Sequence, residues 1–210
     1  MTSPPETFES ERLQLRKPVL ADAEEIFRQY AQDAEVTKYL TWLPYGKVDE
    51  TRAFIRSCLA TWQEGNSYHW TLVRKEDGQL LGMINARVDG HKWELGYVLA
   101  RRYWGRGYMT EAVKSLIDTA FKDPAVYRVW AVCDINNVAS ARVMEKAGMQ
   151  REGLLRRWSV HPTIGAEPHD SFCYSITKES LTNHKDESGN LKAESNFQVS
   201  SFIIHLSSSL

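Results

Sequence analysis

Long apolar runs are absent from this sequence of 210 residues, and cysteine is scarce. None of its apolar stretches approaches the roughly 20 residues that a membrane-spanning helix needs, so we expect no membrane partner. The three cysteines are odd in number, widely spaced and without a CxxC pair, which argues against a disulfide framework. The opening segment MTSPPETFESERLQ is polar and acidic and lacks the apolar core of a signal peptide. We therefore expect a soluble, cytoplasmic protein.

An excess of charge of either sign is also absent. Lysine and arginine number 26 against 27 aspartates and glutamates, for a net charge of −1. A domain that binds nucleic acid through its phosphates usually has a basic footprint, so no direct nucleic-acid partner is expected. The six histidines show no metal-ligand spacing such as HxxxH, so no metal is predicted.

Strand patterns occupy the first half and the end of the sequence. Residues 12–16 alternate between polar and apolar, as a half-buried strand does. Three further strands are predicted at 68–75, 80–88 and 92–100, and Asp89-Gly90 between the last two is a strong hairpin signal. Residues 126–133 are almost continuously apolar, which indicates a buried central strand. Two more strands are predicted near 154–160 and 171–177.

Helical periodicity separates these strands. We predict a helix from about Ala21, a second from Asp49 that Gly65 ends, a third over 109–121 and a short one over 137–146. The aromatic segment 39–46 reads as a loop. The fold class predicted is therefore α+β, in three layers, with a mixed and mostly antiparallel sheet of about seven strands and helices on both faces.

Composition changes near residue 182. The segment NHKDESGNLKAESN is polar and aperiodic, which is typical of a flexible chain. We therefore predict one domain over residues 1–181 and a C-terminal tail over 182–210.

The stretch RRYWGRGYMTEAV, residues 101–113, combines glycine and arginine immediately before a predicted helix. Glycines let the backbone approach a ligand, and the first N–H groups of a helix have no internal partner. Arg101, Arg102 and Arg106 add full charges suited to phosphate oxygens. We therefore predict that this loop and the helix start form a cradle for a pyrophosphate group. The alternative is an ordinary tight turn with solvated arginines. Dinucleotide and P-loop sites are disfavoured, because the third glycine of GxGxxG and the Lys-Ser/Thr of GxxxxGK[ST] are missing.

Three segments, in order along the chain, resemble the GNAT superfamily of N-acetyltransferases. The loop Arg102-x-x-Gly105-x-Gly107 matches the acyl-CoA loop Q/R-x-x-G-x-G/A, and Asn137-x-x-Ser140 followed by EKAGM matches a second family segment. The preceding ELGY, residues 94–97, resembles the RimJ/RimL-type branch, which acetylates N-terminal amines of ribosomal proteins and includes relatives with other acceptors. The resemblance covers about residues 9–178 and implies an enzyme that uses acetyl-CoA as acetyl donor.

The resemblance also implies which residues hold the donor. The backbone of Tyr97, Val98 and Leu99 would line the pantetheine arm, with the Val98 N–H serving the oxyanion. The remaining cofactor-binding residues implied are Arg102, Gly105, Arg106, Gly107, Tyr108, Met109, Thr110, Asn137, Ser140 and Lys146.

Glu94 is the predicted general base, and Trp93, Leu95 and Tyr97 are the neighbours that could supply apolar surroundings. The alternative is an exposed strand glutamate that faces water. The tyrosine that many family members use as general acid corresponds here to Met144, which cannot donate a proton. Ser140 or water is left for that role, although the Ser140 hydroxyl could simply bond its own helix backbone. Asn137 could cap its helix, bind the cofactor or do both.

The predicted acceptor pocket involves Trp42, Tyr45, Trp158 and Asp170, the last also a weaker candidate base. The function predicted is acetyl transfer to a primary amine, on a protein N-terminus or a small molecule, by direct attack on the thioester. The competing prediction is a non-catalytic acyl-CoA-binding or regulatory module. The sequence leaves the acceptor and the oligomeric state open, a dimer included.

Overall fold

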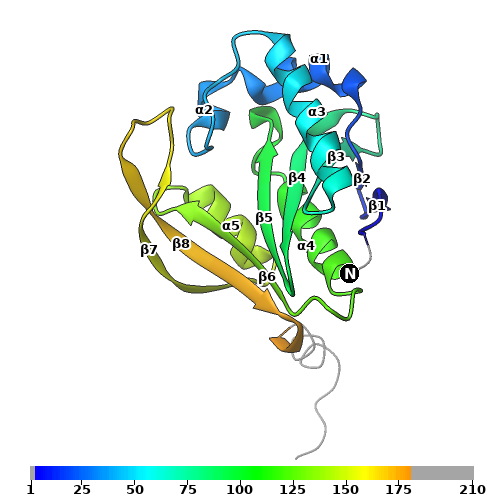
Figure 1. Ribbon diagram of the computed structural model, residues 1–210. Helices are drawn as coiled ribbons and strands as arrows, with labels where there is room; N and C mark the ends of the chain where they lie inside the picture. The colour runs from blue at the N-terminus through cyan, green and yellow to red at the C-terminus, as the bar shows by residue number, and fades with distance from the viewer. Residues whose placement is uncertain (1–2, 181–210) are drawn as a thin grey trace, which may run out of the picture.

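The computed structural model describes residues 3–180, and the predicted tail over 182–210 lies outside the described residues. One sheet organises the fold, with the strand order β1-β2-β3-β4-β5-β6-β8-β7. All neighbouring strands are antiparallel except β5 and β6, which are parallel. The predicted mixed, mostly antiparallel α+β fold is confirmed, with eight strands instead of about seven (Figure 1).

Each strand predicted from the sequence is present, although some begin or end at other residues. The strands of the structure are β1 (Thr7–Glu9), β2 (Leu13–Arg16), β3 (Ser67–Arg74), β4 (Leu80–Asp89), β5 (Lys92–Leu99), β6 (Arg128–Asp134), β7 (Gln150–Val160) and β8 (Pro168–Thr177). The strand missed from the sequence is β1, whose three residues are too few to show a period. Gly90 makes the β4–β5 turn with φ of 53°, a conformation that favours glycine.

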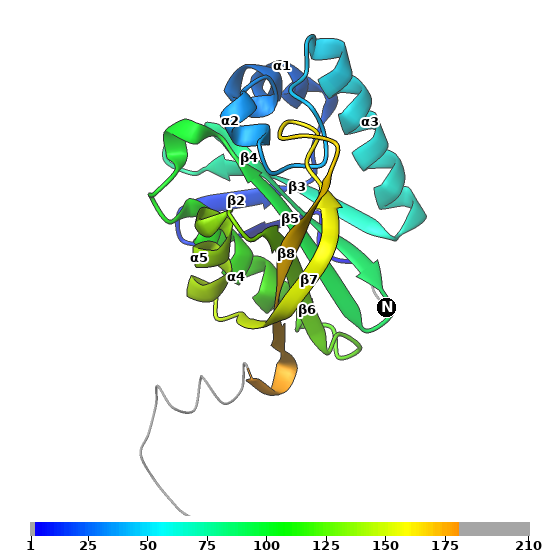
Figure 2. The ribbon, with the colours of Figure 1, turned by 90° about the vertical axis from the view of Figure 1, so that its left-hand side faces the viewer.

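The helices cover both faces of the sheet (Figure 2). On one side lie α1 (Ala23–Ile26), α2 (Ala34–Thr37) and α3 (Val48–Glu64), and on the other α4 (Tyr108–Ala120) and α5 (Val138–Lys146). The helix predicted from Ala21 is in fact a composite. A 3₁₀ turn at Leu20–Asp22 leads into α1, which passes into a π-helical turn at Phe27–Ala31.

The start of α3 differs in detail from the prediction that Asp49 caps it. The Glu50 Oε2 atom accepts hydrogen bonds from the Gly46 and Lys47 N–H groups, at 2.8 and 3.0 Å. The helix ends as predicted at Gly65, in the left-handed conformation with φ of 75°.

The core is apolar and continuous across the sheet. Its largest fully buried side chains include Trp70, Tyr30, Leu13, Leu72 and Ile84. In the part of the chain that the structure describes, no helix is long and apolar enough to cross a membrane.

Candidate active site

The centre of the sheet opens between β5 and β6. These parallel strands pair only at their beginnings, through Lys92–Arg128, Trp93–Val129 and Glu94–Trp130. Beyond these pairs they diverge, and a cleft of about 970 Å³ is lined by the second half of β5, the end of β6 and the first turns of α4 and α5. Residues 38–42, in the loop after α2, also line the cleft, so the cleft extends to the face of the sheet that α1, α2 and α3 cover.

The glycine loop, residues 105–107, places the first turn of α4 at the edge of this cleft. Gly105 and Gly107 have φ of 73° and 80°, and Gly107 is the N-cap of α4 without a side-chain cap. Gly107, Tyr108, Met109 and Thr110 all line the cleft. The first N–H groups of the helix have no intrahelical partner, and together with the helix dipole they form an anion site. The structure therefore has the backbone geometry that the predicted cradle needs, and its binding of a pyrophosphate stays a prediction.

The arginines of the loop lie elsewhere. Arg102 and Arg106 line a separate hollow of about 300 Å³, where Arg102 Nη2 donates to Gln79 Oε1 at 3.2 Å. Arg101 pairs with Asp33 at 3.2 Å. None of the three arginines lines the main cleft, although Tyr103 lines both the cleft and the smaller hollow. Contact of Arg102 or Arg106 with the outer part of the cofactor stays a prediction.

An ion pair that the sequence did not reveal fixes the loop against the sheet. Arg12 Nε donates to Glu111 Oε2 at 2.7 Å, and Arg12 Nη1 donates to the Arg106 carbonyl at 3.1 Å. Burial opposes the charge on Glu111, but hydrogen bonds from Ser10 and Arg12 outweigh it and lower the pKa of that carboxyl. The 99 positions between Arg12 and Glu111 explain why no local pattern pointed to this contact.

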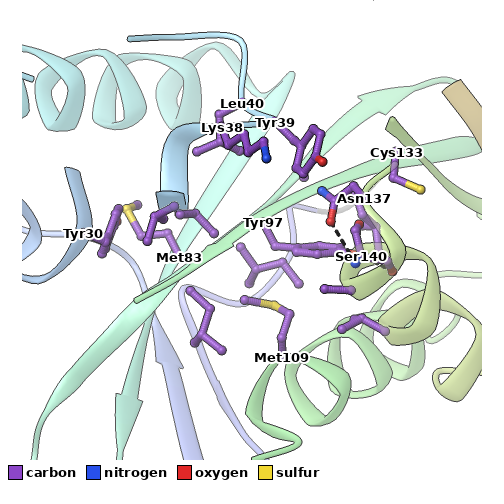
Figure 3. A pocket seen from close by; sticks show the side chains of 18 of the residues that line it. Tyr30, Lys38, Tyr39, Leu40, Met83, Tyr97, Met109, Cys133, Asn137 and Ser140 are labelled. Carbon is purple, nitrogen blue, oxygen red and sulfur yellow. Dashed lines mark hydrogen bonds between the residues drawn. The ribbon is translucent and has the colours of Figure 1, made fainter. Parts of the chain in front are cut away.

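The first turn of α5 forms the other wall of the cleft (Figure 3). Asn137 Oδ1 accepts from the Ser140 N–H at 3.1 Å, so Asn137 caps the helix while lining the cleft. The Ser140 hydroxyl lies 2.8 Å from the Tyr97 hydroxyl, and Lys146 lines the same wall. Met144 is fully buried, so the usual acid position faces the core.

Glu94 lies in the cleft wall on the face covered by α1, α2 and α3. Alternate residues of a strand point to opposite faces, so Glu94 points away from the buried Trp93 and Leu95. The predicted apolar surroundings from Trp93, Leu95 and Tyr97 are therefore wrong. Glu94 instead accepts a hydrogen bond from Arg87, its partner on β4, at 3.1 Å.

The predicted acceptor residues divide into two pairs. Trp42 and Tyr45 line the cleft and stack on each other, with ring centroids 4.8 Å apart. Trp158 is 52% exposed and lies outside the cleft lining. Asp170 also lies outside it. Its Oδ1 accepts from the Arg157 N–H at 2.9 Å, beside an irregularity in the β7–β8 pairing. Trp158 and Asp170 therefore do not line the cleft in this structure, and their contact with the acceptor stays a prediction.

A buried carboxylate at the end of β6 connects the cleft to the β7–β8 hairpin. Asp134 Oδ2 lies 2.8 Å from His169 Nδ1 and 3.4 Å from His161 Nε2, and its Oδ1 accepts from the Asn136 N–H at 2.7 Å. Tyr39, from the loop after α2, packs edge-on against His161 and donates to the Asn136 carbonyl at 3.4 Å. Sequence reasoning missed this cluster because its members come from four separate segments. Across residues 3–180, no group of three or more His, Cys, Asp or Glu side chains is arranged to hold a metal ion.

A split central sheet with a glycine-led helix N-terminus at the split defines the acyl-CoA-binding class of transferase. The family model for the acetyltransferase (GNAT) domain matches residues 12–150, and the chain belongs to this family.

Relatives agree with that assignment. An uncharacterized N-acetyltransferase, p20, from Bacillus licheniformis is 34% identical over 154 residues, covering 72% of this chain and 86% of p20. A GNAT acetyltransferase structure from Bacillus anthracis is 29% identical with a TM-score of 0.73, covering 82% of this chain and 99% of that one. RimL, a ribosomal L7/L12 acetyltransferase solved with coenzyme A, shares the fold at 18% identity and a TM-score of 0.75, over 83% of this chain and 99% of its own. The protein is an acetyltransferase with acetyl-CoA as its donor.

Proposed function

We propose that the protein transfers the acetyl group of acetyl-CoA to a primary amine by direct attack of the amine on the thioester, and that the amine is a protein N-terminus. The observation that carries the proposal is the cleft itself. It joins an anion-binding helix terminus to a carboxylate, Glu94, through one continuous wall of β5. Bound acetyl-CoA supplies a thioester carbonyl that is open to nucleophilic attack.

The chain's own groups take distinct parts. The second half of β5, which has no partner on its β6 side, offers backbone hydrogen bonds to an extended ligand, and the Val98 N–H is the proposed donor to the oxyanion. Glu94 is the proposed general base. As the C–N bond forms, Glu94 takes a proton from the amine nitrogen, directly or through one water.

The C–S bond then breaks and a thiolate leaves. An alkyl thiol has a pKa near 8.5, so the thiolate leaves without strong acid help. The Ser140 hydroxyl, already hydrogen-bonded to the Tyr97 hydroxyl, is the proposed hydrogen-bond donor to the thiolate in place of the missing tyrosine, and water supplies the proton that converts the thiolate to the free thiol.

The choice of a protein N-terminus rests on likeness. The [ribosomal protein uS5]-alanine N-acetyltransferase of Escherichia coli is 22% identical over 98 residues, covering 45% of this chain and half of its own length.

The test is an acceptor screen. Purified protein with acetyl-CoA is incubated with peptides bearing free N-terminal alanine or serine, with spermidine and with an aminoglycoside, and free thiol and acetylated product are measured by colorimetry and mass spectrometry. Acetylated peptide N-termini support the proposal. If only the small amines are acetylated, the proposal that the acceptor is a protein N-terminus is wrong. Acetyl-CoA binding without turnover of any amine would favour the non-catalytic acyl-CoA-binding module.

A further inference from the structure

A row of polar side chains crosses three strands beside Glu94. His69 on β3 pairs with Asn85 on β4, and Asn85 pairs with Gly96 on β5, so all three positions share one face of the sheet. Glu94 lies two residues before Gly96 and shares that face. All four line the cleft.

Gly96 provides the space that Asn85 occupies. A Cβ atom at position 96 would lie 2.6 Å from Asn85 Oδ1, a separation that real Cβ atoms do not tolerate. The Asn85 amide therefore rests directly over the backbone of β5. The Asn85 side chain is half-buried, and among the described residues its amide makes no hydrogen bond, although an asparagine side chain can donate two and accept two.

Neighbouring polar groups are likewise unpartnered. Within residues 3–180, His69 Nδ1 and the Tyr30 hydroxyl are buried and have no hydrogen-bond partner. Burial, followed by the nearby charge of Arg87, lowers the pKa of His69 to about 4, so the imidazole is neutral at neutral pH. Tyr30 belongs to the π-helical turn and lies next to Met83 in the cleft (Figure 3).

Buried polar groups without partners are uncommon in native proteins, and several around one cleft point to a polar ligand. The buried group on this row is the neutral imidazole of His69, and the half-buried Asn85 amide lies beside it. Together they match an uncharged partner that both donates and accepts. The charged side chains on the same face, Arg87 and Glu94, already pair with each other.

We propose that Asn85, seated over Gly96, together with His69 binds the peptide group that adjoins the acceptor amine, which makes Asn85 the residue that selects a peptide or protein N-terminus. The spacing supports this assignment. Positions 94 and 96 are about 7 Å apart along the strand. An α-amine at Glu94 and its adjoining carbonyl at Asn85, with one hydrogen bond at each end, bridge such a span. This inference rests on the proposed acetyl transfer to an amine and names what that site recognises.

The test compares two amines of matched shape. Alanine N-methylamide carries the peptide group, and isopropylamine replaces it with a methyl. An α-amino group has a pKa of about 8 and an alkylamine one of about 10, so kcat/KM is expressed per concentration of neutral amine. On that scale we expect the parent protein to show a value at least tenfold higher for alanine N-methylamide, as loss of a hydrogen bond in a site built for it implies. Asn85→Leu should reduce this preference to near parity by lowering kcat/KM for the amide only. Isopropylamine turnover and the acetyl-CoA Kd, measured by calorimetry, should stay within about twofold of the parent values.

Gly96→Ala is a second, independent variant, because its new Cβ displaces the Asn85 amide without changing it. We expect it to lose the preference as Asn85→Leu does. The matched control is Gly153→Ala on β7, where a Cβ meets no atom within 4 Å and the preference should persist. Circular dichroism checks folding, and if Asn85→Leu does not fold, Gly96→Ala decides.

The possible contrary results are distinct. A parent that treats both amines alike, or variants that keep the full preference, would overturn the role of Asn85. Acetylation of spermidine with neither test amine accepted would overturn the peptide assignment while leaving acetyl transfer intact. If none of these amines causes thiol release, both the inference and the proposed function are overturned.

Discussion

Replacing Glu94 with Gln tests its role as general base, because the substitution should lower kcat strongly while changing the stability of the fold little. The substitution keeps the size of the side chain and one oxygen that can accept from Arg87, but removes the basicity. The ion pair it breaks is partly exposed, with Arg87 67% and Glu94 29% accessible, so we expect a stability cost below about 1 kcal/mol. Loss of general-base help should lower kcat by about 10²–10⁴, which corresponds to roughly 2.7–5.5 kcal/mol of activation free energy.

The assay is thiol release at saturating acetyl-CoA across a pH series. The Glu94→Gln rate should recover partly at high pH, where more of the amine is already neutral. Arg87→Gln is the control, since it breaks the same ion pair but keeps the carboxylate, and it should retain most of the activity. Parent-like turnover and pH profile in Glu94→Gln would show that Glu94 is not the base. An equal loss in both variants would assign the effect to the ion pair instead.

Three further predictions concern the cradle, a buried histidine and a helix cap. By calorimetry, Gly107→Asp should bind acetyl-CoA with a much higher Kd than Gly107→Asn. Both residues tolerate the left-handed backbone, and only aspartate brings negative charge to the predicted anion site. Equal Kd values for the two variants would contradict the cradle. The pKa of His69 is about 4 in the folded protein against an ordinary value of 6.5, so the unfolded chain takes up the proton first and stability should fall as pH drops from about 6.5 to 4. In His69→Gln the melting temperature should depend less on pH over that window. An unchanged pH dependence of the melting temperature would refute this prediction. Asn137→Ala removes the α5 cap and should cost about 1 kcal/mol, or 2–4 °C in melting temperature, whereas Asn137→Asp, which can still accept from the Ser140 N–H, should cost less.

Local chemistry explains which parts of this fold were predictable from the sequence. Asp89-Gly90 and Gly65 act within a few residues of themselves, so the hairpin and the end of α3 could be read directly. The family motifs likewise placed Gly107, Asn137 and Ser140, all of which line the cleft.

Contacts between distant segments could not be read in this way. The directions of Arg102 and Arg106 depend on how the loop turns over Gln79, and the partner of Glu94 depends on the β4–β5 register. The same holds for Asn85, whose position over Gly96 is set by the alignment of two strands. No periodicity distinguishes such a residue from any other strand asparagine.

The brief pairing of β5 and β6 means that the sheet has four edges instead of two. Two of them face each other across the cleft. Beyond Glu94 and Trp130, β5 and β6 have strand partners only on their outer sides, β4 and β8 respectively. Open edges normally attract other strands, and proteins usually protect them. Here the donor substrate would act as the missing strand, so its occupancy should be visible in the backbone itself. Amide hydrogens of residues 95–99 that point toward β6 should exchange quickly in the free protein and become protected when acetyl-CoA is bound.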